Sequence, residues 1–143
     1  MAATEIKTQI TINASPQEVW AVLTEFESYT SWNTFITQIE GEPTVGNRLA
    51  VQIDGMGFKP KVLVVEPQRA LIWRGRLLLP GIFDGRHSFE LIDNGDGTTT
   101  FVHSETFRGV LVPMLKKKLM TETRAGFERM NAELKERVEG VEN

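Results

Sequence analysis

Two runs of alternating apolar and polar residues near the middle of the chain predict a long β-hairpin over residues 83–107. In both runs the phenylalanines fall on odd-numbered positions, whereas the even-numbered positions are mostly polar. This is the two-residue period of a strand, in which successive side chains point to opposite faces. The glycine-rich segment 93–97 between the runs can supply the positive φ angles of a turn. One face of the hairpin is therefore expected to be apolar.

Three polar side chains, His87, His103 and Glu105, share this apolar face. Matching the apolar faces of the two arms requires an even register. The register that we favour forms three pairs: Phe89 with Phe101, His87 with His103, and Phe83 with Phe107. It brings the two imidazoles and the carboxylate close together on a surface built otherwise from phenylalanine.

The residues before the hairpin predict one strand followed by two short helices. Residues 5–12 alternate between apolar and polar, as in a half-buried strand. Ser15, Pro16 and Glu18 form a capping box, in which the serine caps a helix and the proline takes its first position. The aromatic stretch 29–35 is broken by serine, threonine and asparagine, so we expect a short second helix or turn there.

More strands and a long helix complete the predicted architecture. Four further strands, each closed by a glycine, proline or aspartate signal, are predicted at residues 36–41, 48–53, 59–66 and 70–78. From about Leu111 apolar residues recur every three or four positions, which predicts a long amphipathic helix. Gly126 costs this helix about 1 kcal/mol relative to alanine and suits a close approach to the sheet.

The predicted fold class is α+β, with a curved antiparallel sheet of about six or seven strands wrapped around the C-terminal helix, in a single domain spanning residues 1–143. A sheet of this size twists strongly, and a helix laid across its concave side encloses a space. That space is either a packed core or a cavity, and its size decides the function.

Composition excludes several classes of function. With 41% hydrophobic and 24% charged residues the chain is ordinary globular protein, and no window approaches the roughly 20 apolar residues of a membrane span, so we expect no stable membrane insertion. A net charge of −3 gives no basic face for nucleic acid. The absence of cysteine removes disulfides and thiolate chemistry. The N-terminus lacks a secretory pattern, and we expect a cytoplasmic protein.

Several motifs, in this order and spacing, resemble the START-like or Bet v 1-like (SRPBCC) superfamily, particularly its polyketide cyclase/dehydrase branch. They span nearly the whole chain and are Ala14-Ser15-Pro16-x-Glu18-Val19-Trp20-x-Val22-Leu23, Phe26-x-x-Tyr29-x-x-Trp32-Asn33-x-Phe35, Leu71-x-Trp73-Arg74-Gly75, Pro80-Gly81-x-Phe83-x-Gly85-x-His87-x-Phe89-x-Leu91, Phe101-x-His103-x-Glu105-x-Phe107-x-Gly109 and Gly126-Phe127-x-x-Met130-Asn131. The resemblance implies a helix-grip fold around a hydrophobic cavity. Members bind lipids, sterols, polyketides, quinones or plant hormones, and only some are enzymes.

His87, His103 and Glu105 have four interpretations, which we give in the order that we favour them. They are hydrogen-bonded polar groups in a wet cavity, because an unpaired buried polar group costs about 1–3 kcal/mol. They orient a ligand in an apolar pocket. They act as acid and base next to a carbonyl, as in an aldol-type cyclisation or dehydration. Finally, two histidines and a glutamate match a metal facial triad in ligand type. We expect neither a metal nor another cofactor.

The leading hypothesis is a carrier or sensor that holds a hydrophobic small molecule, such as a lipid, polyketide, quinone or other aromatic metabolite, between sheet and helix. The candidate ligand-binding residues are Trp32, Phe35, Trp73, Phe83, His87, Phe89, Phe101, His103, Glu105, Phe107, Leu119, Phe127 and Met130. The alternatives are an enzyme of the polyketide cyclase/dehydratase type that uses the two histidines and the glutamate, and a protein-interaction module of the same fold.

The expected state is a monomer or a homodimer. An apolar segment from Leu111 precedes three lysines at residues 116–118 and could touch a membrane surface. We favour instead a helix N-terminus packed on the sheet, with the lysines on its solvated face.

Overall fold

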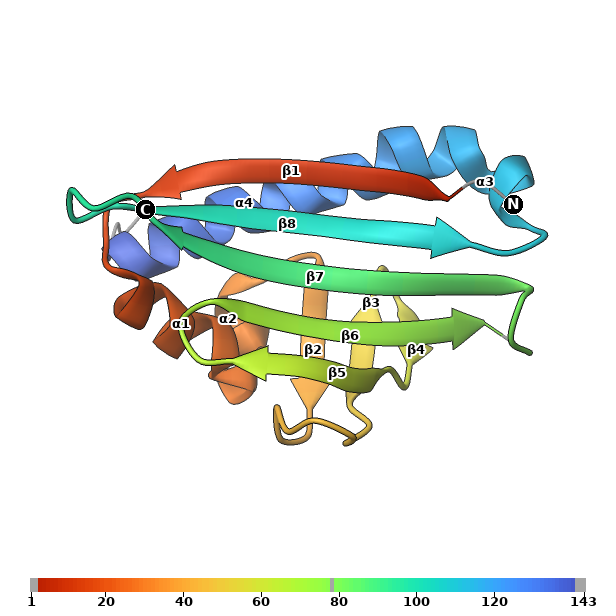
Figure 1. The fold of residues 1–143 in the computed structure, drawn as a ribbon, viewed down its shortest axis with the longest axis horizontal. Coiled ribbons are helices and arrows are strands. Elements are labelled where there is room, and N and C mark those ends of the chain that lie inside the picture. The colour runs from red at the N-terminus through yellow and green to blue at the C-terminus, as the bar shows by residue number, and fades with distance from the viewer. Residues whose placement is uncertain (1–2, 78, 141–143) are drawn as a thin grey trace.

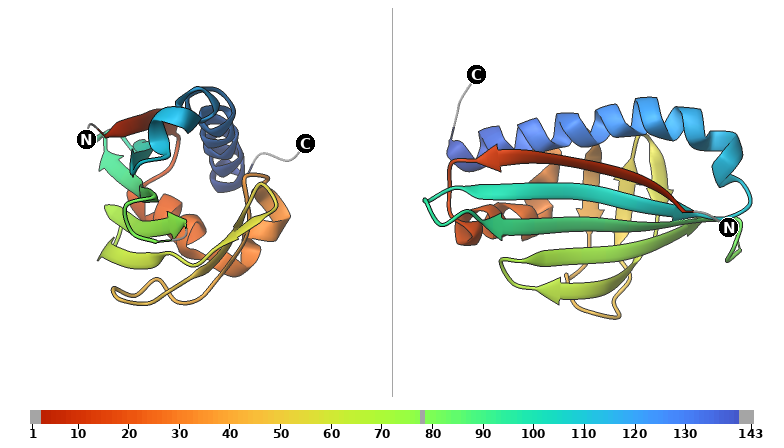
Figure 2. Two further views of the ribbon diagram at one scale, coloured as in Figure 1. Left: turned by 90° about the vertical axis from the view of Figure 1, so that its right-hand side faces the viewer. Right: turned by 45° about the horizontal axis from the view of Figure 1, so that its top comes forward.

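The structure, a computed structural model, describes residues 3–77 and 79–140, which form two antiparallel sheets and a long C-terminal helix (Figure 1). Within this part of the chain the larger sheet has the strand order β1-β8-β7-β6-β5, with bounds Thr4–Ile12, Thr99–Arg108, Phe83–Asp93, Ala70–Leu77 and Lys61–Glu66. The smaller sheet consists of β2 (Ile36–Glu40), β3 (Ala50–Ile53) and β4 (Met56–Phe58). Its strands run across those of the larger sheet (Figures 1 and 2). The predicted α+β class is confirmed.

The single sheet of six or seven strands that the sequence predicts is divided into these two sheets. β4 is absent from the prediction, which uses the pair Asp54-Gly55 only as the end of a strand. Both residues have positive φ, 49° and 78°, which is the two-residue turn of a β-hairpin. The strand predicted at residues 59–66 starts at Lys61, because Pro60 has no N–H to donate to a ladder.

The helices follow the predicted order closely. α1 (Pro16–Thr24) begins where the capping box places it, and the Ser15 hydroxyl accepts a hydrogen bond of 3.3 Å from the Glu18 N–H. A 3₁₀ turn, Phe26–Ser28, and α2 (Tyr29–Trp32) form the short second helical element. These helices cover one end of the larger sheet (Figure 1).

The C-terminal helix runs without a break through α3 (Val112–Lys118), a π-helical turn at Leu119–Thr123, and α4 (Arg124–Glu139). Its start confirms the change of period near Leu111. The π-helical turn was not predicted. It contains one residue more than an α-helical turn, and apolar residues spaced three or four apart are compatible with either. Such π-helical turns occur frequently at functional sites. Among the described residues, no helix is both long and apolar enough to cross a membrane.

The predicted register of the β7–β8 hairpin is wrong by two residues. The structure pairs Phe89 with His103 and His87 with Glu105, instead of Phe89 with Phe101 and His87 with His103. Phe107 likewise lies opposite Gly85 rather than Phe83. Because the shift is even, the same side chains still share one face. The loop causes the shift: Asp93 accepts a hydrogen bond of 2.9 Å from the Gly95 N–H and pairs with Thr99, which leaves five residues in the turn.

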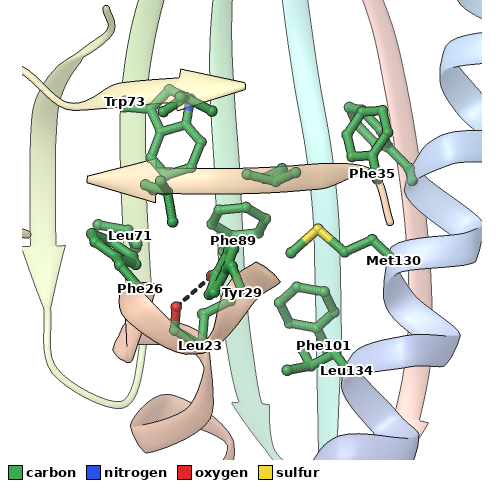
Figure 3. Close-up of a cluster of buried hydrophobic side chains, with 14 of the residues drawn as sticks. Leu23, Phe26, Tyr29, Phe35, Leu71, Trp73, Phe89, Phe101, Met130 and Leu134 are labelled. Carbon is green, nitrogen blue, oxygen red and sulfur yellow. Dashed lines mark hydrogen bonds between the residues drawn. The ribbon is translucent and has the colours of Figure 1, made fainter. Parts of the chain in front are cut away.

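The apolar core packs between the sheets and the helices, and Figure 3 shows a cluster of its buried side chains. At its centre Tyr29 is fully buried and its hydroxyl donates a hydrogen bond to the Leu23 carbonyl. Burial raises the pKa of Tyr29 well above its ordinary value, so the phenol stays neutral. The rings of Phe89 and Phe101 stack beside it on β7 and β8, with centroids 5.8 Å apart. Toward the other end of these two strands the packing gives way to a cavity.

Candidate functional site

A cavity of about 330 Å³ lies between the larger sheet, the smaller sheet and the start of the C-terminal helix. β6, β7 and β8 supply one wall, β3 and β4 supply a second, and the end of α3 with the π-helical turn supplies a third. Most of the exposed surface within it is apolar. The volume falls at the lower end of the range of small-molecule sites, about 300–1,000 Å³.

Two facing glycines hollow out the sheet wall. Gly75 on β6 pairs with Gly85 on β7, two residues along from the pair formed by Trp73 and His87. A Cβ atom at Gly85 would overlap Oε2 of Glu105. Glycine inside a strand weakens it, and it often marks a place where another group approaches the backbone closely. Here the missing side chains leave room for the carboxylate and for the cavity.

The three polar side chains predicted on the apolar face are brought together. His87 Nδ1 lies 3.1 Å from Glu105 Oε1, and His87 Nε2 lies 2.7 Å from His103 Nε2. Only His87 and Glu105 of this cluster line the cavity. His103 is completely buried behind His87, and the ring of Phe127 stacks on it with centroids 4.0 Å apart. The side-chain contacts thus lead from Glu105 and His87 at the cavity to His103 in the core.

Two further polar residues extend this chain of hydrogen bonds. Asn131 on α4 has its Oδ1 atom 2.9 Å from His103 Nδ1. Its Nδ2 atom donates to the hydroxyl of Thr8 on β1 over 2.8 Å. That hydroxyl donates in turn to the backbone carbonyl of His103 over 2.9 Å. All three residues are buried, so these bonds satisfy polar groups that water does not reach.

Burial makes His103 a neutral imidazole. Its pKa is held well below the ordinary value, first because burial disfavours the charged ring and second because two neighbouring imidazolium rings, His103 and His87, would repel each other. The hydrogen bond with Asn131 acts in the opposite direction and is outweighed. His103 therefore takes part in the site as a neutral hydrogen-bonding group.

The candidate ligand-binding residues divide into two groups. Seven of them line the cavity: Phe35, Trp73, Phe83, His87, Glu105, Phe107 and Leu119. The other six are part of the packing outside it: Trp32, Phe89, Phe101, His103, Phe127 and Met130. The division follows position along the strands. On β8, Phe101 lies at the end covered by α1 and α2, whereas Phe107 lies at the open end.

Twelve residues that line the cavity were not among the candidates from the sequence, and many of them belong to the smaller sheet and the C-terminal helix. The further lining residues are Val51, Ile53, Asp54, Met56, Phe58, Pro60, Gly75, Arg76, Gly85, Leu115, Lys118 and Thr123. The glycines inside β6 and β7 could have indicated this part of the wall, because glycine inside a strand often marks a place where a ligand or another group approaches the backbone closely. Arg76, which strand parity predicts to point away from Trp73, borders the cavity, with Nε 3.6 Å from Asp84 Oδ1.

Comparison with known proteins gives one family and many similar folds. The sequence profile of the family described as polyketide cyclase / dehydrase and lipid transport matches residues 3–139. No curated protein sequence matches the chain.

Three of the similar solved structures illustrate the range of proteins with this fold. A START superfamily protein from Mycobacterium smegmatis has a TM-score of 0.73 at 19% identity, over 96% of this chain and 99% of that one. A hypothetical protein, jhp0584, from Helicobacter pylori has a TM-score of 0.81 at 13% identity, over 94% and 88%. Norcoclaurine synthase from Thalictrum flavum, solved with dopamine and hydroxybenzaldehyde, has a TM-score of 0.73 at 14% identity, over 99% and 90%. The likeness establishes the helix-grip fold.

Proposed function

The chain belongs to the polyketide cyclase/dehydrase and lipid transport family, and from this premise we propose that it is a carrier or sensor that binds a hydrophobic small molecule in the cavity between the sheets and the C-terminal helix. The observation that carries the proposal is a mostly apolar cavity of about 330 Å³ in which the contacting pair His87 and Glu105 lies on the sheet wall, with the charged side chains of Arg76 and Lys118 also at its border. Small-molecule sites are usually built in this way, with few polar groups that orient the ligand.

The lining side chains favour a flat, uncharged ligand. Trp73 and Phe107 present aromatic surface on the sheet wall, and Met56 and Leu119 offer adaptable apolar contacts across from them. The structural neighbour from Thalictrum flavum, solved with dopamine and hydroxybenzaldehyde, provides an example of small aromatic molecules bound by the same fold. We therefore propose an aromatic or polycyclic metabolite rather than a long-chain lipid.

Native mass spectrometry of the full chain tests this proposal. Freshly purified protein, and protein incubated with an organic extract of the expressing cells, should show a species heavier than the 16.1 kDa polypeptide. Extraction with organic solvent should return the polypeptide mass and release one class of apolar molecule. If the protein shows only the polypeptide mass under both conditions, the carrier proposal is wrong.

A second candidate function, acid–base catalysis in the same cavity, is favoured by the contact of 3.1 Å between His87 Nδ1 and Glu105 Oε1. A carboxylate there would remove a proton from a carbon next to a carbonyl group, and the imidazole would hold the carboxylate in place.

The flat bicyclic ketone 2-tetralone in deuterated water provides a direct test of this chemistry. Wild-type enzyme would speed the exchange of its α-protons for deuterium by at least about a hundredfold over buffer. The Glu105→Gln variant, which keeps the size of the side chain, would still bind the ketone and lose this acceleration. If the wild type does not speed the exchange, this second candidate is excluded for ketones of this class, and the carrier function stands alone.

A further inference from the structure

We propose that Thr8 and Asn131 are positioning residues that fix which nitrogen of each histidine carries a proton, and that they thereby place one mobile proton, with no net charge, on the His87–Glu105 pair at the cavity wall. The ligand preference that follows from this proton rests on the proposed function. The positions of the protons on the two histidines do not depend on it.

Thr8 determines the orientation of the Asn131 amide. The hydroxyl of Thr8 lies 2.9 Å from the backbone carbonyl of His103, which can only accept, so the hydroxyl donates its single proton there. Its oxygen is then free to accept, and it accepts from Asn131 Nδ2 over 2.8 Å. The amide therefore presents Oδ1, an acceptor, to His103 Nδ1, 2.9 Å away.

The amide in turn determines the tautomer of His103. An acceptor at 2.9 Å requires a proton on His103 Nδ1. Because the buried ring is neutral, it carries one proton only, and its Nε2 atom is a bare acceptor. The contact of 2.7 Å between His103 Nε2 and His87 Nε2 then requires that His87 Nε2 carries the donated proton.

One proton remains to be placed, between His87 Nδ1 and Glu105 Oε1, which lie 3.1 Å apart. Without it, a lone pair on nitrogen would face a lone pair on the carboxylate. With it, the pair is either an imidazolium with a carboxylate or an imidazole with a carboxylic acid. Both forms have no net charge, and they differ only in the position of the proton.

The opposite orientation of the amide would give a different site. If Asn131 presented Nδ2 to His103, then His103 would carry its proton on Nε2 and donate it to His87 Nε2. A neutral His87 would then donate its own Nδ1 proton to the Glu105 carboxylate. The pair would have a net charge of −1 and no mobile proton. A buried hydroxyl on the far side of His103 from the cavity thus sets the charge that a ligand meets.

For a ligand, the proposed arrangement favours a neutral group that both donates and accepts, such as a hydroxyl or an enol. Because the pair has no net charge, it does not compensate the charge of a ligand carboxylate or of a ligand ammonium group. Burial in an apolar cavity makes either mismatch costly.

The test is nitrogen NMR of the imidazole rings in uniformly ¹⁵N-labelled, solvent-extracted protein. The chain has two histidines and both are in the site, so four ring nitrogens report the whole arrangement. At neutral pH the wild type should show a proton on Nδ1 and not on Nε2 of His103, together with a proton on Nε2 of His87. A wild-type His103 protonated on Nε2 would overturn the proposal without any variant.

Two substitutions at one position separate positioning from packing. Thr8→Val keeps the shape of the side chain and removes the hydroxyl, so the amide loses its reason to prefer one orientation. The fraction of His103 protonated on Nε2 should rise at least about tenfold. Thr8→Ser keeps the hydroxyl and should retain the wild-type pattern. If Thr8→Val folds with the wild-type pattern, Thr8 does not position the ring. Because the protein carries no ligand in this experiment, a failure of ligand binding would leave the result unchanged.

Discussion

Replacing Gly126 by valine is expected to lower the free energy of unfolding by about 2–3 kcal/mol, which is the usual cost of overpacking a core. A Cβ atom at this position would lie 2.5 Å from Cδ1 and 2.6 Å from Cε1 of Phe35. Phe35 cannot move away easily, because it is 1% exposed and packs edge-on against Phe127 with centroids 5.4 Å apart. Helix propensity alone predicts the opposite sign, since glycine is the poorer helix former.

The neighbouring substitution Ala125→Val provides the matched control. Ala125 lies on the same turn of α4 but is exposed, so valine there should cost less than about 1 kcal/mol, through helix propensity only. Urea unfolding of the wild type and both variants measures the difference. A Gly126→Val variant as stable as the wild type would show that the helix and Phe35 do not touch as closely as described.

Gly126 also shows what a sequence pattern can and cannot predict in this fold. A glycine within an amphipathic helix predicts a close approach to another element, but it does not say which one. The partner is Phe35, directly before the first strand of the smaller sheet, and the sequence gives no sign that this sheet folds over the helix. Helix capping at Ser15 was predictable because it depends on residues three positions apart.

The hairpin that carries the site was predictable in its faces but not in its register. Alternation has a period of two, so it cannot distinguish registers that differ by two residues. The loop makes the choice, through hydrogen bonds such as that of 3.0 Å from the Thr98 N–H to Asp96 Oδ1. His87, His103 and Glu105 meet in either register, because their side chains reach along the strands as well as across them.

The boundary between core and cavity could not be predicted from the same alternation. Phe101 and Phe107 lie on one face of β8, and nothing local distinguishes them. Their different roles depend on long-range packing: α1 and α2 cover the end of the sheet where Phe101 lies, whereas Phe107 lines the cavity that the smaller sheet and the C-terminal helix enclose. Long-range packing of this kind has no signature in a two-residue period.

The second large effect is expected at Gly75, on the hollowed part of the sheet wall. Leucine there should weaken the binding of a hydrophobic ligand at least tenfold, about 1.4 kcal/mol, by occupying part of the cavity. The backbone tolerates the change, because the nearest atom to a new Cβ is Pro60 Cβ at 3.9 Å and φ is not in the positive region. The fold should therefore be retained, with an unfolding midpoint in urea no lower than that of the wild type.

Arg74→Leu is the matched control for this change. Arg74 is the neighbouring residue on β6 and is not among the residues that line the cavity, so the same side chain is introduced outside it. Its effect on ligand binding should stay within about twofold.

Fluorescence titration with 1-aminoanthracene, a flat and uncharged probe, is the measurement that tests the cavity most directly. The wild type and Arg74→Leu should bind one probe per chain with similar affinity, and Gly75→Leu should bind it at least tenfold more weakly while remaining folded. If Gly75→Leu binds the probe as tightly as the wild type, or if the wild type does not bind it at all, the space between the sheets and the helix is not a ligand site.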